Sequence, residues 1–119
     1  MRDILFRGKR LDNGEWVEGD LVHSVYKIGD TCVGTYRNSL WMHQVDPSTV
    51  GQYTGLKDKH GNRIFEGDVV VFRESKYVVE WVEKYCRFSG RNEGTVFAGF
   101  SFDRCEVIGN IHDGGFGDD

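Results

Sequence analysis

The same short segment occurs twice in this sequence. Residues 13–22 (NGEWVEGDLV) align with residues 61–70 (GNRIFEGDVV), and each copy has an aromatic or apolar residue, then Glu-Gly-Asp, then two apolar residues. A glycine and a basic stretch precede each copy, at 8–12 and at 55–60. Such a repeat predicts two similar halves, about residues 1–54 and 55–112. Because neither half is large enough for a generous core of its own, we expect the halves to pack on each other.

The glycine and aromatic content favours extended structure. The 119 residues include 16 glycines and one proline, together with eight Phe, five Tyr and three Trp. Glycines suit tight turns, and aromatic residues are enriched in strands. We therefore predict a mainly β fold of two similar small barrel-like or curved-sheet halves with only short helical turns. They form a single compact domain over 1–112, and a flexible acidic Gly-rich tail follows at 113–119.

Local patterns place the individual strands. Two hairpins are predicted, one joining 21–26 to 31–36 and one joining 68–72 to 77–82 across the polar residues 73–76. Further strands are expected at 96–102 and 106–111. Single helical turns are expected after Asp46, which precedes Pro47, and after Asp103, because Asp is a favourable N-cap. The predicted core is aromatic: Trp16, Trp41, Trp81, Phe65, Phe72, Phe97, Phe100 and Phe102.

Charge and cysteine content point to a cytoplasmic protein. The net charge is -4, no apolar run is long enough to cross a membrane, and residues 1–10 have no apolar signal core. Cys32, Cys86 and Cys105 are odd in number and form no Cys-x-x-Cys pair, so we expect reduced, mostly buried thiols. The four histidines show no metal-ligand spacing, and no phosphate-binding loop is present. We predict no catalytic residue, no metal site and no cofactor.

The repeated Glu-Gly-Asp has a structural and a chemical interpretation. Two carboxylates two residues apart in a strand share a face and suit an acid/base pair or a hard cation. Alternatively, glycine supplies a turn or bulge conformation, and Asp accepts hydrogen bonds from backbone amides at the strand entrance. We favour the second interpretation because the motif occurs in a repeat, which makes this a structural turn motif: Glu18, Gly19, Asp20, Glu66, Gly67 and Asp68.

Two basic turns stand out in an otherwise acidic chain. They suggest a bipartite surface for phosphates, and the candidate nucleic-acid contacts are Arg7, Lys9, Arg10, Lys57, Lys59 and Arg63. The competing interpretation is that lysines at turn tips are simply solvated.

The motifs together resemble a known family. Residues 51–58 (GQYTGLKD), 64–70 (IFEGDVV) and 106–111 (EVIGNI), with 6–9 (FRGK) and 16–20 (WVEGD) near the start, resemble the YopX family of bacteriophage and prophage proteins. The resemblance covers nearly the whole chain. It implies a phage or prophage origin, a mainly β fold and a setting in the bacterial host cytoplasm. It implies no established activity and no catalytic residue.

We therefore predict a phage or prophage accessory protein that acts as a non-catalytic binding or interaction module. A nucleic-acid-associated factor that uses the basic turns is the alternative, and an enzyme that uses the Glu-Gly-Asp carboxylates comes third. A phage or host protein is a possible partner, and no membrane is expected. A homo-oligomer is also predicted, because residues 77–82 and 96–102 carry apolar side chains on both faces of a strand.

Overall fold

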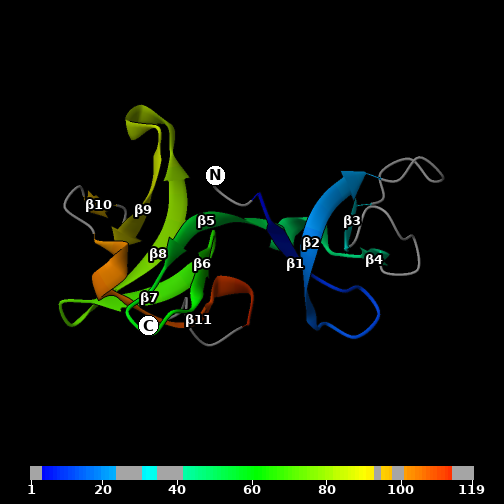
Figure 1. Ribbon diagram of the computed structural model, residues 1–119, viewed down its shortest axis with the longest axis horizontal. Helices are drawn as coiled ribbons and strands as arrows, with labels where there is room; N and C mark the ends of the chain where they lie inside the picture. The colour runs from blue at the N-terminus through cyan, green and yellow to red at the C-terminus, as the bar shows by residue number, and fades with distance from the viewer. Residues whose placement is uncertain (1–3, 24–30, 35–41, 93–94, 98–100, 114–119) are drawn as a thin grey trace. The chain divides into compact units, whose positions relative to one another are not determined.

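Figure 1 shows the chain in a computed structural model, which describes residues 4–23, 31–34, 42–92, 95–97 and 101–113. The predicted mainly β fold is confirmed: the described residues form antiparallel strands joined by turns, with helical structure limited to three-residue 3-10 turns. The strands are β1 (Phe6–Lys9), β2 (Trp16–His23), β3 (Thr31–Gly34), β4 (Met42–Gln44), β5 (Gly51–Lys57), β6 (Arg63–Phe65), β7 (Asp68–Phe72), β8 (Ser75–Val82), β9 (Arg87–Asn92), β10 (Thr95–Phe97) and β11 (Glu106–Asn110).

The chain divides into two compact units, Met1–Tyr53 and Thr54–Asp119. Strand β5 begins in the first unit and ends in the second. The predicted organisation as one domain, with the halves packed on each other, stays a prediction.

The first unit is an antiparallel sheet in the order β4-β3-β2-β1, followed by the start of β5. In the β1–β2 hairpin, Lys9 lies opposite Trp16. Strand β2 also pairs with β3, with Leu21 opposite Val33, so the predicted first hairpin is confirmed within the described residues. The expected strand residues 24–26 and 35–36 lie outside them.

Two of the 3-10 turns test the capping predictions. The turn η2 (Pro47–Thr49) follows Asp46 as expected, and the Asp46 carboxylate accepts a hydrogen bond from the Ser48 amide at 3.0 Å. The turn η4 (Phe102–Arg104) contains Asp103 instead of following it. Asp103 accepts a hydrogen bond from the Ser101 hydroxyl, and Ser101 is the N-cap residue, so the predicted Asp103 cap is wrong.

The second unit contains a five-stranded antiparallel sheet in the order β10-β9-β8-β7-β11, while β6 borders the end of β5. The predicted hairpin over 68–82 is confirmed, with a shorter loop than expected. Phe72 pairs with Ser75, and the two loop residues Arg73 and Glu74 have φ of 51° and 68°. Positive φ at both positions is typical of the type I′ turn, whose twist matches that of the flanking strands.

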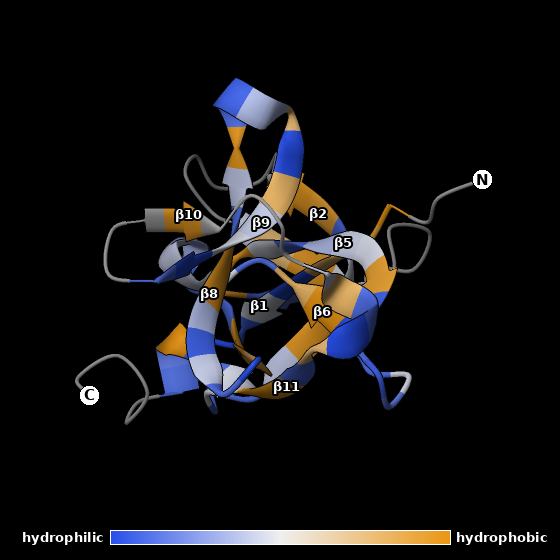
Figure 2. Ribbon diagram, turned by 90° about the vertical axis from the view of Figure 1, so that its left-hand side faces the viewer, coloured by the Kyte–Doolittle hydropathy of each residue, from blue (hydrophilic) through white to orange (hydrophobic). Residues whose placement is uncertain are grey.

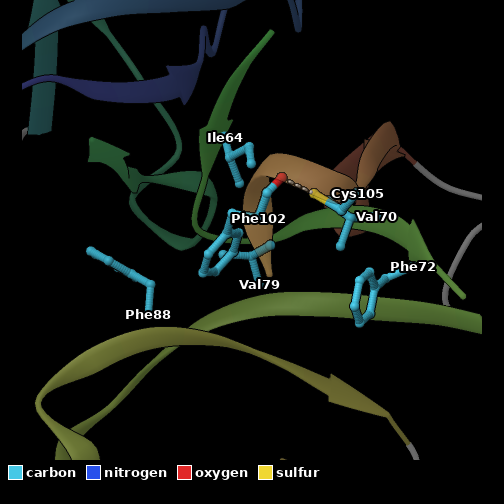
Figure 3. Close-up of a cluster of buried hydrophobic side chains, with 7 residues drawn as sticks. All are labelled: Ile64, Val70, Phe72, Val79, Phe88, Phe102 and Cys105. Atoms are coloured by element: carbon cyan, nitrogen blue, oxygen red, sulfur yellow. Dashed lines mark hydrogen bonds between the residues drawn. The ribbon is translucent and has the colours of Figure 1, made fainter. Parts of the chain in front are cut away.

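The core of the second unit joins residues that are far apart in the sequence (Figure 3). The cluster consists of Ile64, Val70, Phe72, Val79, Phe88, Phe102 and Cys105. The Cys105 thiol donates a hydrogen bond to the Phe102 carbonyl at 3.0 Å. Figure 2 shows β6, which supplies Ile64, mostly in the hydrophobic colours.

The aromatic core prediction holds only in part. Phe65, Phe72 and Phe102 are buried as expected. Trp81 is 44% exposed and Trp16 is half-buried, so neither fills a core. The side chains of Trp41, Phe97 and Phe100 lie outside the described part of the chain.

Two further features concern the ends and the membrane. The predicted tail begins at Asp113, which closes the turn η5 (Ile111–Asp113), and residues 114–119 lie outside the described residues. Within the described ranges, no helix has the length and apolar character needed to cross a bilayer.

Candidate functional site

The second Glu-Gly-Asp motif forms the turn between β6 and β7. Asp68 is buried, with an exposed fraction of 1%. Its Oδ2 accepts a hydrogen bond from the Phe65 amide at 2.8 Å, and its Oδ1 accepts one from Asn110 Nδ2 at 3.0 Å. Gly67 has a φ of +86°, and its amide donates to the Val79 carbonyl. Asp68 therefore ties this turn to β11.

The first Glu-Gly-Asp motif lies inside a strand. Residues 18–20 are in the middle of β2, so this copy forms no turn, although Gly19 has a positive φ of +155° within the strand. A Cβ at Gly19 would lie 2.2 Å from the Gly34 carbonyl oxygen on β3. Glu18 and Asp20 are exposed, whereas Asp68 is buried. The two copies share a sequence, but their carboxylates have different environments.

The described part of the structure does not group these carboxylates with further metal-ligating side chains. Among the residues that the structure describes, no group of three or more His, Cys, Asp or Glu is placed to hold a metal ion. Both oxygens of Asp68 accept hydrogen bonds from the protein, which is a stabilising arrangement for a buried carboxylate.

A second buried carboxylate, Asp58, organises the loop between β5 and β6. Its Oδ1 accepts hydrogen bonds from the His60 and Asn62 amides, at 2.9 and 2.8 Å. Its Oδ2 accepts from the Val107 amide at 3.0 Å and from Asn62 Nδ2 at 3.3 Å. Burial by itself raises the pKa of Asp58, but these hydrogen bonds outweigh it and hold the pKa below its ordinary value. The amino-acid sequence gives no signal for the link to Val107, because that residue lies on β11, far from Asp58 in the chain.

The second basic turn is the loop that Asp58 holds. Lys57, Lys59 and Arg63 are all exposed on it or beside it. Lys59 Nζ lies 3.9 Å from Glu106 Oε2, and His60 Nε2 lies 3.6 Å from Glu106 Oε1. Glu106 therefore lies beside this basic loop and reduces its positive electrostatic potential.

The first basic turn brings two cations to one indole ring. The Arg7 guanidinium carbon lies 4.4 Å from the centre of the Trp16 ring, and Lys9 Nζ lies 5.3 Å from it. Arg7 and Lys9 are two residues apart on β1 and share a face, and Lys9 lies directly opposite Trp16 on β2. Both distances are within the range of cation–π attraction. Trp16 is thus a candidate site residue that the sequence assigned to the core.

Arg10 is held apart from this cluster by an acidic neighbour. Its Nε and Nη2 donate to the two carboxylate oxygens of Asp12, at 2.9 and 2.5 Å. The hydrogen bond with Asp12 raises the pKa of Arg10, and the same contact lowers the pKa of Asp12. An open hollow of about 240 Å³ lies beside the pair, lined by Arg10, Leu11, Asp12, His43 and Gln44. Because the charges of Arg10 and Asp12 are paired with each other, neither residue offers an unpaired charge to a ligand in this hollow.

Exposed aromatic residues gather at the tip of the β8–β9 hairpin. Trp81 is 44% exposed, and Tyr85, in the turn η3 (Glu83–Tyr85), is 48% exposed. Figure 1 shows this hairpin reaching beyond the other strands of the second unit. The sequence patterns did not predict this surface, because the alternation of apolar and polar residues along a strand does not show which side chains are exposed.

The three cysteines are free thiols in different environments. Cys32 is half-buried, Cys86 is exposed and Cys105 is buried, so the expectation of mostly buried thiols is wrong for Cys86. Burial, followed by the negative charge of Asp58, raises the pKa of Cys105 to about 11. Cys105 is therefore protonated at neutral pH and is a weak nucleophile.

Comparison with known proteins relates the chain to a protein family. The family model described as YopX protein matches residues 5–115, which is nearly the whole chain. No curated protein matches the chain significantly.

Proposed function

The chain belongs to the YopX protein family, and we propose that it acts as a non-catalytic binding module. In this proposal it is an accessory protein of a phage or prophage in the cytoplasm of the bacterial host. A phage or host protein is its main partner.

The observation that supports this role is how the buried ionisable groups are used. Asp58 and Asp68 accept hydrogen bonds from backbone amides and asparagine side chains, and Cys105 donates to a carbonyl. Catalytic acids and nucleophiles need a reactive atom that is accessible to substrate. Asp58 and Asp68 instead connect the β5–β6 loop and the β6–β7 turn to β11, and Cys105 closes the turn η4, so all three groups have structural roles.

The test is affinity capture with the full chain as bait, in bacterial cells that carry an induced prophage. Cross-linking and mass spectrometry then identify the partner and the contact residues. The matched bait carries Glu18→Gln, Asp20→Asn and Glu66→Gln. A binding module retains the same partner with this bait. An activity on the captured partner that disappears in the carboxylate variant contradicts the proposal and favours an enzyme.

The second candidate function is nucleic-acid association through the first basic turn. The observation that favours it is the placement of Arg7 and Lys9 over Trp16, which holds two cations at one surface. Replacing Arg7 and Lys9 by Ala is expected to weaken binding of any DNA or RNA and to flatten its salt dependence. The control is Arg10→Ala, because Asp12 already neutralises that residue. Equal binding by all of these variants contradicts this candidate.

The predicted homo-oligomer remains part of the proposal. On β8, Val78 and Val82 alternate with Val79 and Trp81, so both faces of the strand carry apolar side chains. Val78 and Val82 are half-buried. Sedimentation of the full chain at micromolar concentration tests this prediction. A clean monomer that also fails to bind an apolar-surface dye excludes self-association through exposed apolar strands.

A further inference from the structure

The tip of the β8–β9 hairpin presents two aromatic rings among charged side chains. Trp81 and Tyr85 are each about half-exposed, and Glu83, Lys84 and Arg87 around them are exposed. Figure 2 shows the tip in mixed hydrophilic and hydrophobic colours. The rings are therefore separate apolar surfaces within a polar tip.

Several local contacts support the tip. Trp81 lies opposite Phe88 on β9, and the two rings meet edge to face with their centres 5.1 Å apart. The Cys86 amide donates to the Glu83 carbonyl at 3.0 Å, and Cys86 has a φ of +50°, which reverses the chain into β9. Lys84 Nζ lies 5.8 Å from the centre of the Tyr85 ring. The contact with Phe88 restricts the Trp81 ring, which lowers the entropy cost of binding a ligand there.

The charge of the tip is opposite to that of the chain. Residues 81–88 carry two cations, Lys84 and Arg87, and one anion, Glu83, whereas the whole chain has a net charge of -4. The next acidic residue along β8, Glu80, is paired with Arg91 at 2.5 Å. A local excess of positive charge beside exposed rings favours an anionic ligand that also has flat apolar faces.

The size of the apolar surface argues against a protein partner or a second copy at this tip. Burying a whole aromatic side chain removes about 150–250 Å² from water, so two half-exposed rings offer about 200 Å² together. A stable protein interface needs roughly 800 Å² from each partner. Base stacking needs only one ring for each base.

We propose that the tip of the β8–β9 hairpin binds single-stranded nucleic acid, with bases stacked on Trp81 and Tyr85 and phosphates contacted by Lys84 and Arg87. This inference goes beyond the binding role proposed above, because it adds a nucleic-acid ligand at a site separate from any protein partner's. It uses residues of the second unit only, so it does not depend on Arg7, Lys9 or Trp16.

The experiment is fluorescence anisotropy of a labelled oligothymidylate of about 16 nucleotides, titrated with the full chain. We expect binding that weakens between about 50 and 200 mM salt, with a log–log slope of about -1.4 for two phosphate contacts. Trp81→Ala and Tyr85→Ala are each expected to lower the affinity about tenfold. Lys84→Ala is expected to reduce the slope by about 0.7.

Two matched controls belong to the same unit. Leu56→Ala removes an apolar side chain that is 46% exposed, and Lys76→Ala removes a lysine at the other end of β8. Both variants are expected to bind like the unmodified chain. Trp81→Phe keeps a ring and is expected to restore most of the affinity lost in Trp81→Ala. Tyr85→Ala keeps the test valid if Trp81→Ala unfolds, because the exposed Tyr85 lies in η3.

Several results overturn the inference. They are no binding at low salt, equal affinity for a duplex of the same length, unchanged affinity in both Trp81→Ala and Tyr85→Ala, and a dimer that Trp81→Ala dissociates. If the oligonucleotide does not bind while the partner in the capture experiment is retained, the hairpin inference fails and the binding role stands.

Discussion

Asp68 and Asn110 form a buried side-chain pair, with 3.0 Å between the carboxylate Oδ1 and the amide Nδ2. Asp68 begins β7 and Asn110 ends β11, and the two residues lie opposite each other in the sheet. Asn110 Oδ1 also accepts a hydrogen bond from the His112 amide at 2.9 Å. One asparagine thus connects the Glu-Gly-Asp turn to the last strand and to the turn that follows it.

Removing this asparagine is expected to destabilise the fold. Asn110→Ala leaves Asp68 Oδ1 and the His112 amide without these partners, and we expect the free energy of unfolding to fall by about 2 kcal/mol. Urea unfolding followed by circular dichroism measures the change. Asn13→Ala, at an exposed turn, is the control and is expected to change stability by less than about 0.5 kcal/mol. Similar stability of both variants contradicts a structural role for the pair.

Substitutions at three glycines distinguish the cost of backbone strain from the cost of steric contact. Gly61 and Gly67 have nearly the same φ, +83° and +86°, but only at Gly67 would a Cβ meet a neighbour, Asn110 Nδ2 at 3.2 Å. We expect Gly61→Ala to cost about 1 kcal/mol from strain alone and Gly67→Ala to cost more. Gly19→Ala is expected to cost about 3 kcal/mol or more, because its Cβ would be 2.2 Å from the rigid Gly34 backbone. Unfolding experiments that rank Gly61→Ala as the most damaging variant contradict this geometry.

The hydrogen bonds of Asp58 predict acid sensitivity. The folded protein holds its pKa below the ordinary value of 3.8, so the ionised carboxylate contributes stability above that pH. The contribution is lost as the pH falls through the folded pKa. Asp58→Asn is expected to cost about 2 kcal/mol at neutral pH, and the difference from the unmodified chain is expected to shrink in acid. A difference that does not change with pH, measured by urea unfolding, means that the charge of Asp58 is unimportant.

The cysteines are expected to react with iodoacetamide in order of exposure. At about pH 8, Cys86 reacts first in the folded chain, while Cys105 is protected because it is buried and its pKa is raised to about 11. Mass spectrometry of digested samples measures the modification at each site. In denaturant without reductant all three are expected to react, and a missing site there indicates a disulfide. Rapid modification of Cys105 in the folded chain contradicts its burial.

The sequence alone was sufficient to predict local features of the fold. The β-prone run 68–72, followed by a polar break and a second run, predicted the β7–β8 hairpin, and Asp46-Pro47 predicted the turn η2. Such features are predictable because the residues that cause them are neighbours in the chain. The basic residues at 7–10 and 57–63 were also recognisable as groups, because charge clusters need no tertiary information.

The tertiary structure decided what each of these residues does. Trp16 lies beneath two cations because the strand register places it opposite Lys9. Trp81 contacts the core residue Phe88 across the hairpin and remains 44% exposed. The two Glu-Gly-Asp copies differ because Gly19 lies against the Gly34 backbone in a sheet, whereas Gly67 turns the chain beside Asn110. Identical local sequences adopted different structures because their neighbours, supplied by distant segments, determine which backbone conformation and which hydrogen bonds are available.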